Sequence, residues 1–347
     1  MLTNEQIEEI REHLSNAQNP LFFFDNDQDG LFSFLLLQRY IGRGKGVPVK
    51  SFPELSVDYF RKVRELNADY IFILDKPVVS REFFKEIEQV NIPAVWIDHH
   101  NVDAKEVPGF VQYYNPLMSC GKSEPTTFLC YQISQKKEDL WIAVAGCIAD
   151  KFIPSFYSDF AKEYPELSIN TEDAFDIFYK SGIGKIARIC GFALKDRTTN
   201  VINMLRFLMK CRSPYDVLEE TSKNRFIHER FREINRKYQR LIEKAINSRE
   251  NTDKILFFKY SGDLSISSDL SNELIYRFPG KVIVVAYVSG AKVNISVRGK
   301  NIREVVLRAI EDIDGAGGGG HEDAVGVKLK IEDLEIFKKN LEKFLIH

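Results

Sequence analysis

Short apolar runs alternate with amphipathic stretches along the first half of the chain. The runs at residues 21–24, 70–74 and 94–97 are rich in β-branched and aromatic side chains, so we expect a buried strand at each. Around them, apolar residues recur at intervals of three and four, which predicts helices packed on a sheet at residues 32–40, 57–66, 80–90 and 140–149. This alternation is typical of βαβ units built around a parallel sheet.

The pattern changes in the second half of the chain. Between residues 184 and 250 the strand-like runs disappear, and a long helical stretch is predicted at residues 215–248. Strand patterns then return, and the Ser289-Gly290 pair between two of them predicts a hairpin. The elements expected after residue 250 are strands at 255–260, 282–288, 292–297 and 325–331, and helices at 302–313 and 334–345.

These patterns predict an α/β protein in three parts. A parallel-sheet domain is expected at residues 1–184, a helical linker at 185–250 and a smaller α/β domain at 251–347. The length of 347 residues is sufficient for two such domains.

The composition is that of an ordinary globular protein. Apolar residues make up 44% of the chain and charged residues 28%, which excludes wholesale disorder. No apolar run is long enough to cross a bilayer, and the first residues show no basic region followed by an apolar one, so we expect a cytoplasmic protein without membrane contact. Scattered cysteines without a CxxC pair fit a reducing compartment and argue against a zinc–thiolate site; they are Cys120, Cys130, Cys147, Cys190 and Cys211.

The charges are distributed unevenly along the chain. The net charge is −2, but residues 185–249 contain 16 basic and 7 acidic residues, a local balance of +9. This excess of basic residues fits either a solvated helical linker or a surface that contacts a nucleic-acid backbone. Aromatic residues interleave with it, most of them expected in a helix core and one or two available for base stacking: Phe192, Phe207, Tyr215, Phe226, Phe231 and Tyr238.

Acidic residues gather where the expected strands end. They are Asp25, Asp27 and Asp29 after the first strand, Asp75 after the second, Asp98 with His99 and His100 after the third, and Asp150 after a helical run. Parallel strands end at one edge of their sheet, where ligands bind in open α/β folds. Like charges gathered there repel one another, so we expect a cation or several backbone donors to compensate them.

The alternating aspartates also match the start of an EF-hand loop. The twelfth position counted from Asp25 is Leu36, where such a loop needs a bidentate Glu, so we reject this interpretation. An Asp-rich turn that caps a helix would explain one of the three aspartates. Carboxylates with one or two imidazoles suit Mn²⁺ best, with Mg²⁺ as the second candidate. Their number suits two ions that share a carboxylate and favour in-line attack on a phosphorus atom.

A glycine run lies near the C-terminal end. Five of the six residues from Gly315 to Gly320 are glycine. Such a run is most often a flexible loop, but it can also direct successive backbone N–H groups at an anion. Arg298 on the preceding strand and His321 after the run would complement a phosphate. The histidines without such neighbours, His13, His228 and His347, are expected at the surface.

In their order and spacing, the acidic groups resemble the four metal motifs of the DHH phosphoesterase family. The segment from Gly315 to Gly326 is similar to the GGGH signature of the DHHA1 domain, and Ser296-Val297-Arg298 is similar to the strand arginine upstream of it. The resemblance therefore covers both ends of the chain. The basic motif of the family's pyrophosphatases is not found.

The resemblance implies roles for individual residues. The implied metal set is Asp25, Asp27, Asp29, Asp75, Asp98, His99 and Asp150. Within it, Asp27 and Asp29 would bind separate ions and Asp75 would bridge them as part of the catalytic machinery, while Asp150 and His99 would complete the second ion's shell. One departure concerns Phe23, which stands where many members have a histidine, so that Asp25 would replace that ligand of the first ion.

The resemblance also implies how substrate is held. His100 would lie toward the scissile phosphate, either as a hydrogen-bond donor or as a residue that orients a ligand. The group that grips the substrate would be Arg298, Gly319, Gly320 and His321, together with His100.

Among family members, the chain looks most like compact archaeal RecJ-like exonucleases. The resemblance implies a two-metal phosphodiesterase that degrades single-stranded DNA, or RNA, in repair or replication, with a helicase as a candidate partner and a slight lean toward 3′→5′ polarity. One alternative is a nanoRNase or cyclic-dinucleotide phosphodiesterase that hydrolyses very short oligonucleotides. Another is a non-catalytic scaffold, although the metal carboxylates that such a protein would lack are all present.

Overall fold

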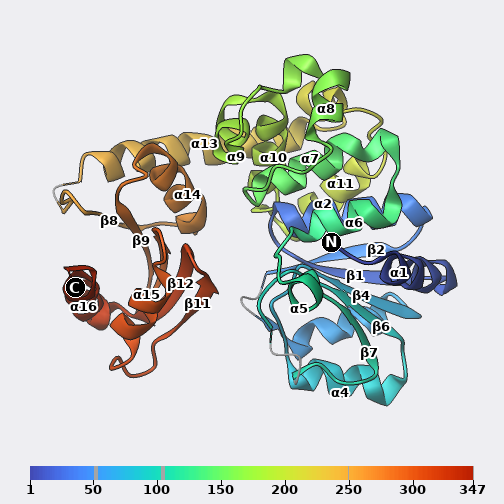
Figure 1. Cartoon of the computed structure of the whole chain (residues 1–347), viewed down its shortest axis with the longest axis horizontal. Coiled ribbons are helices and arrows are strands. Elements are labelled where there is room, and N and C mark those ends of the chain that lie inside the picture. The colour runs from blue at the N-terminus through green and yellow to red at the C-terminus, as the bar shows by residue number, and fades with distance from the viewer. Residues whose placement is uncertain (51–53, 103–105, 249, 347) are drawn as a thin grey trace. The chain divides into compact units, whose positions relative to one another are not determined.

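The computed structural model describes residues 1–50, 54–102, 106–248 and 250–346. The chain divides into two compact units, Met1–Phe231 and Arg232–His347 (Figure 1). The boundary falls within the segment for which the sequence predicts a linker, and the three-part division stays a prediction. None of the described helices combines the length and apolar character that crossing a bilayer requires.

The first unit is built on a parallel five-stranded sheet. Its strands lie in the order β2 (Lys45–Val49), β1 (Pro20–Asp25), β4 (Tyr70–Leu74), β6 (Ala94–Ile97) and β7 (Val111–Tyr114). The three central strands confirm the predicted ones. The outer strands were not predicted, because β2 contains a glycine and a proline and the apolar run of β7 is broken by the exposed Gln112. A separate two-stranded sheet pairs β3 (Glu54–Leu55) with β5 (Val78–Val79).

Both faces of this sheet are buried, which explains why its central strands are continuous apolar runs. Phe22 and Phe24 of β1 pack into one core, and Leu21 and Phe23 pack into another on the opposite face. Figure 1 shows α2 and α6 on one side of the sheet and α4 on the other. The alternation of side chains along β1 therefore divides its aromatic residues between two helical layers.

The helices of the first unit include all those that the sequence predicts there. The segment at 57–66 forms a short 3₁₀ turn, η1 (Val57–Phe60), followed by α3 (Arg61–Glu65). The helices, with two more 3₁₀ turns, are α1 (Asn4–Asn16), α2 (Gln28–Ile41), α4 (Arg81–Val90), α5 (Pro116–Cys120), α6 (Thr126–Ser134), η3 (Lys137–Asp139), α7 (Leu140–Ala149), α8 (Tyr157–Glu163), η4 (Pro165–Leu167), α9 (Ala174–Lys180), α10 (Gly182–Ala193) and α11 (Thr198–Leu208).

The single helix predicted at residues 215–248 is interrupted, so that prediction is wrong in part. The segment forms α12 (Tyr215–Leu218) and α13 (Arg225–Ile246). Between them, the buried Asn224 side chain donates to the carbonyl oxygens of Asp216 and Glu219 at 3.0 and 2.8 Å. These bonds replace the helical ladder with a side-chain-stabilised turn.

The expected surface position of two histidines is also wrong. His228 is buried on α13, with Nε2 3.0 Å from the Val217 carbonyl oxygen. His13 on α1 is partly buried, with Nδ1 2.5 Å from the Tyr70 hydroxyl. The predicted surface positions failed because each histidine meets a partner that is distant in sequence. His347 lies outside the described residues.

The second unit contains a mixed five-stranded sheet. The order is β11 (Gly317–His321), β12 (Ala324–Lys330), β10 (Lys292–Arg298), β9 (Val282–Ser289) and β8 (Ile255–Ser261). Only the β8–β9 pair is parallel. The predicted β9–β10 hairpin is confirmed, with Gly290 in the left-handed region at φ 60°. The remaining elements are α14 (Ser267–Arg277), which was not predicted, α15 (Arg303–Ile310), η5 (Ile331–Asp333) and α16 (Leu334–Ile346).

One glycine controls the approach of α2 to β1. A Cβ atom added at Gly30 would overlap the backbone oxygen of Asp25 and lie 2.7 Å from its nitrogen. We expect Gly30→Ala to destabilise the protein by about 1–3 kcal/mol, because the backbone must shift to relieve the overlap. Urea unfolding measures this loss. Gly109→Ala is the matched control, since no atom would lie within 4 Å of its Cβ; equal losses in both variants would contradict the prediction.

Candidate metal centre

The parallel register of the sheet brings the predicted acidic residues together. β1 ends at Asp25, and Asp75 and Asp98 directly follow β4 and β6. The hydrogen bonds between neighbouring strands extend to Asp75 and Asp98. The Asp75 nitrogen donates to the Ile97 oxygen at 3.0 Å, and the Asp98 nitrogen donates to the Tyr114 oxygen at 3.1 Å. β2 and β4 lie on opposite sides of β1, so the strand order of the sheet reverses at β1. Doubly wound sheets bind ligands at such a reversal.

Asp29, Asp75 and His99 form the central cluster. All three are buried, and each offers one ligand atom within 4.8 Å of the others. His99 Nε2 lies 3.3 Å from Asp75 Oδ1, 3.8 Å from Asp29 Oδ2 and 3.9 Å from Asp150 Oδ2. Asp75 itself has a left-handed backbone at φ 57°, a conformation that Asp adopts more readily than most residues. The structure thus brings together four of the residues that the sequence singles out.

Backbone donors that the sequence did not reveal hold this cluster in place. The Thr126 and Thr127 nitrogens at the start of α6 each donate to a different oxygen of Asp29 at 2.8 Å. Ser123 orients His99, since the Ser123 hydroxyl lies 3.0 Å from Nδ1 and donates to the His99 carbonyl oxygen at 2.9 Å. Pro125 signals the start of α6, but no sequence pattern links that helix to a carboxylate 97 residues earlier.

Asp98 and His100 form a second, tightly paired group. Asp98 is fully buried, and its oxygens accept from His100 nitrogen at 3.1 Å and contact His100 Nδ1 at 2.7 Å. Burial lowers the pKa of His100, but the Asp98 carboxylate outweighs it and raises that pKa to about 9. The buried Asn115 side chain donates to the His100 carbonyl oxygen at 2.7 Å, a contact that the sequence did not indicate. In this arrangement Asp98 fixes the ring of His100.

Asp25 and Asp27 lie beside the central cluster and have further partners; desolvation of the carboxyl and repulsion by Asp29 raise the pKa of Asp27, whose side chain also bonds to Asp75. Asp25 Oδ1 lies 3.0 Å from the ammonium of Lys76, whose side chain is fully buried. Asp27 is exposed, and its side chain caps α2 by accepting from the Gly30 nitrogen at 3.0 Å. Phe23, the residue in the place of the family's histidine, points into the opposite core and packs edge-on against Tyr59 and Phe83.

Protein groups compensate the charges of the central cluster only in part. Burial and repulsion by Asp29, Asp27 and further carboxylates raise the pKa of Asp75 well above its ordinary value. Burial and repulsion by Asp150 likewise raise the pKa of Asp29, against the opposing effect of His99. Buried oxygen donors with one imidazole nitrogen are the ligands that Mn²⁺ and Mg²⁺ accept. The donor set therefore fits a hard divalent cation.

Of the residues predicted to grip substrate, His100 lies in the first unit, and Arg298, Gly319, Gly320 and His321 lie in the second. Arg298 at the end of β10 is held by α14, since its Nε donates to Asn272 Oδ1 at 2.7 Å and its Nη2 donates to the Ser268 hydroxyl at 3.0 Å. Gly319, Gly320 and His321 belong to the edge strand β11. From Gly317 onward the glycine run is therefore a strand and not the flexible loop that such runs most often form.

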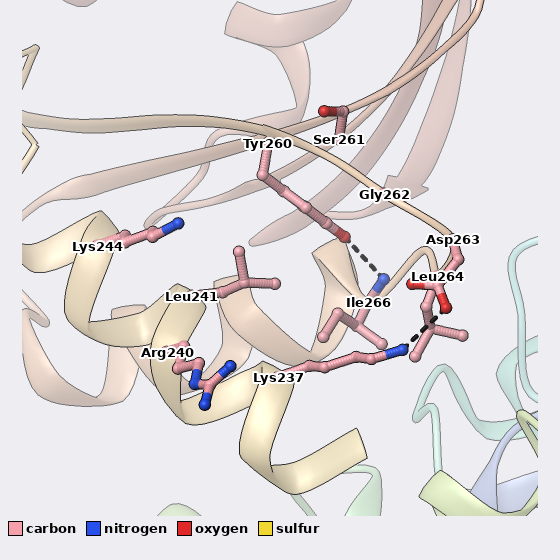
Figure 2. Close-up of a pocket in the computed structure, with 10 residues that line it drawn as sticks. All are labelled: Lys237, Arg240, Leu241, Lys244, Tyr260, Ser261, Gly262, Asp263, Leu264 and Ile266. Atoms are coloured by element: carbon pink, nitrogen blue, oxygen red, sulfur yellow. Dashed lines mark hydrogen bonds and ion pairs between the residues drawn. The ribbon is translucent and has the colours of Figure 1, made fainter. Parts of the chain in front are cut away.

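A basic pocket lies between α13 and the segment that follows β8. Figure 2 shows Lys237 and Lys244 extending from α13 toward this segment, on either side of Leu241. Lys237 pairs with Asp263 at 2.8 Å, whereas Arg240 and Lys244 are exposed and pair with no residue in the described part of the chain. The pocket has a volume of about 190 Å³ and is lined by Lys237, Arg240, Leu241, Lys244, Tyr260, Ser261, Gly262, Asp263, Leu264 and Ile266.

Solved structures of low sequence identity share this fold. RecJ from Thermus thermophilus, in complex with Mn²⁺, has a TM-score of 0.69 and 15% identity over 98% of this chain and 54% of its own, so the chain spans about half the length of that protein. An exonuclease RecJ bound to manganese has a TM-score of 0.65 and 15% identity over 98% of this chain and 93% of its own. The pGpG-specific phosphodiesterase PggH from Vibrio cholerae has a TM-score of 0.50 and 13% identity over 95% of this chain and 99% of its own.

Together, these comparisons show that the chain has the fold of the RecJ structures. Residues 253–346 match the family model of the DHHA1 domain, so the second unit contains a DHHA1 domain. The predicted α/β fold and the predicted DHH/DHHA1 relationship are confirmed. No curated protein sequence matches the chain.

Repulsion within the central cluster leads to a stability prediction. A carboxylate whose pKa is raised by folding destabilises the folded state above the pKa of the unfolded chain, and that destabilisation is present at pH 7. We expect Asp75→Asn to raise the melting temperature of the metal-free protein at pH 7 by about 2–4 °C, equivalent to about 1 kcal/mol. Differential scanning calorimetry in a chelator measures the change.

The same variant tests whether the cluster binds a cation. Mn²⁺ should raise the melting temperature of the wild type, because an ion that binds only the folded state stabilises it, and should raise that of Asp75→Asn much less. Asp58→Asn, at an exposed position, is the matched control and should behave as the wild type in both conditions. A lower metal-free melting temperature for Asp75→Asn would contradict the repulsion argument.

Proposed function

We propose that this protein is a metal-dependent phosphodiesterase that removes nucleotides from an end of single-stranded DNA, with RNA as a second candidate substrate. The observation that carries the proposal is the buried cluster of Asp29, Asp75 and His99 at the carboxyl edge of a parallel sheet. Buried acidic groups without compensating protein cations are costly, so their presence favours a function that needs them. Neighbours in fold include an exonuclease RecJ bound to manganese.

The residues of the first unit would divide the chemical work between them. Asp29, Asp75, His99 and Asp150 would hold a divalent ion, Mn²⁺ first and Mg²⁺ second. When bound, such an ion supplies an attacking water of lowered pKa and neutralises charge on the phosphoryl oxygens. Because Asp98 engages Nδ1 of His100, a hydrogen bond from that ring to a phosphate oxygen would come from Nε2.

Residues of the second unit would bind the strand. Arg298 is held rigidly by Asn272 and Ser268, which reduces the entropy that its guanidinium would lose on binding a phosphate. Gly319, Gly320 and His321 lie on an edge strand and would present backbone and imidazole groups to the same substrate. Arg240 and Lys244 would contact a further phosphate of a longer strand.

Strands of graded length, labelled at the 5′ or the 3′ end, test the proposal directly. We expect Mn²⁺-dependent release of mononucleotides, and a fall of at least about 100-fold in Asp29→Ala, since loss of a residue that only orients a ligand already costs up to about that much. Asp58→Ala is the control and should retain activity. Release of no mononucleotide from either end would reject the exonuclease.

The same assay separates the alternatives. A steep fall in rate beyond about five nucleotides would favour a hydrolase of very short oligonucleotides, the direction suggested by the PggH neighbour. If Asp75→Ala degraded substrate as fast as the wild type, the activity would come from a contaminating nuclease. That result would favour a non-catalytic scaffold. The labelled end that is lost first gives the polarity, for which we lean toward 3′→5′. A helicase partner and a cytoplasmic location stay predictions.

The basic pocket generates a separate prediction about salt dependence. Replacing Arg240 and Lys244 by alanine should weaken binding of a long single strand and reduce the slope of log K against log salt by about 0.7 for each phosphate that is no longer neutralised. Fluorescence anisotropy in a chelator measures binding without hydrolysis. Lys292→Ala with Lys339→Ala removes the same charge from exposed positions of the same unit and should leave the slope nearly unchanged. Equal slopes in both double variants would exclude the pocket as a phosphate-binding surface.

A further inference from the structure

Lys76 occupies an unusual position beside the acidic cluster. It follows Asp75 directly, its side chain has 0% exposure, and its Nζ lies 3.0 Å from Asp25 Oδ1. Its backbone is fixed as well, because the Trp96 indole donates to the Lys76 carbonyl oxygen at 3.0 Å. Lysine is almost never fully buried unless it is paired, and this ammonium is a fixed positive charge with Asp25 as one of its partners.

The pairing uses one of the two carboxylate oxygens of Asp25. Asp25 Oδ1 accepts from both the Lys76 ammonium at 3.0 Å and the Asn26 nitrogen at 2.9 Å. A divalent ion at this oxygen would have to approach the ammonium closely, and two cations that share one carboxylate oxygen in a buried site repel strongly. The Lys76 ammonium therefore offsets part of the charge of Asp25, although burial and repulsion by Asp27 still raise the pKa of that carboxyl to about 6.

The grouping of ligand atoms separates Asp25 from the central cluster. Asp29, Asp75 and His99 offer atoms within 4.8 Å of one another, and so do Asp75, Asp98 and His100. Among the described residues, no such group of three includes Asp25 or Asp27. The two groups share Asp75, and neither of them includes Asp25.

A second feature points independently in the same direction. Phe23 lies on β1 two residues before Asp25, with 0% exposure, and packs against Phe83 in the core on the opposite face of the sheet. It has no ligand atom to offer, and its burial leaves no room for a polar replacement that reaches the site. In a two-ion centre, the ion at Asp25 would therefore lack a ligand at position 23, and at Asp25 it would lie close to the Lys76 ammonium.

We propose that Lys76 takes the place of one of two metal ions, so that the centre holds a single divalent ion on Asp29, Asp75, His99 and Asp150. The ammonium places a positive charge 3.0 Å from Asp25 Oδ1 without any free metal. This inference deepens the proposed function, because it concerns the same carboxylate edge, and it rests on the proposal that this edge binds metal. The number of carboxylates led us to expect two ions. In the arrangement proposed here, one ion and the ammonium of Lys76 take their place.

Metal stoichiometry tests the inference without reference to activity. Native mass spectrometry and elemental analysis after equilibration with Mn²⁺ should give one ion per wild-type chain, and the electron paramagnetic resonance spectrum should be that of an isolated Mn²⁺ ion. Lys76→Met removes the ammonium while keeping an unbranched side chain, and should admit a second ion with the spectrum of a coupled pair. Lys85→Met, at an exposed position on α4, is the matched control and should bind one ion.

The outcomes separate this inference from the proposed function. Two ions per wild-type chain would overturn it even if Lys76→Met fails to fold, because the wild-type measurement needs no variant. One ion per chain in a protein that degrades no nucleic acid would support the inference and reject the exonuclease. Absence of any bound Mn²⁺ in the wild type would overturn both. Asp29→Asn should bind no ion, and retention of one ion in that variant would place it elsewhere and overturn the inference.

Discussion

Repulsion between buried carboxylates is the constraint on which the architecture of the first unit depends. Asp29 and Asp75 lie in the interior, where the interaction of like charges is much stronger than in water. They can be held together only because the strands and helices that carry them are fixed by two apolar cores, one on each face of the sheet. Packing energy is thus used to maintain an arrangement that electrostatics alone would disperse.

The groups that offset this repulsion come from three different kinds of structure. The start of α6 offers two backbone N–H groups to Asp29, a donor arrangement that favours an ionised carboxylate. Asp98 receives both donors of His100, and Asp25 receives the Lys76 ammonium. Even so, burial and mutual repulsion raise the pKa of Asp75 well above its ordinary value and also raise the pKa values of Asp25, Asp27 and Asp29. A cation at this edge would offset the negative charge that remains.

Much of this arrangement could be predicted from the sequence, because it depends on local patterns. The apolar runs that become β1, β4 and β6 are bounded by the acidic residues themselves, and a parallel sheet places all strand ends of one direction at one edge. The gathering of Asp29, Asp75 and His99 follows from those two facts. The edge strands could not be predicted in this way, since β2 and β7 are short and half exposed, and their pairing depends on the rest of the sheet.

The remaining features depend on contacts between residues far apart in the chain. The sequence around Lys76 does not indicate that its ammonium pairs with a carboxylate 51 residues earlier. The sequence around Thr126 does not indicate that its backbone nitrogen donates to Asp29. The burial of His228 depends on the carbonyl oxygen of Val217, which is exposed by the turn at Asn224. Such contacts are set by tertiary packing, for which neither periodicity nor composition carries a signal.

The ordered glycine strand has an energetic consequence of its own. Glycine loses more backbone freedom on ordering than any other residue, and β11 has no side chains from Gly317 to Gly320 with which to recover that loss. The strand is paired on one side only, with β12, and forms the outer edge of its sheet. A ligand that hydrogen-bonds to the outer edge would add the missing half of the ladder. Recognition at this edge and local folding of the strand would then be a single coupled equilibrium.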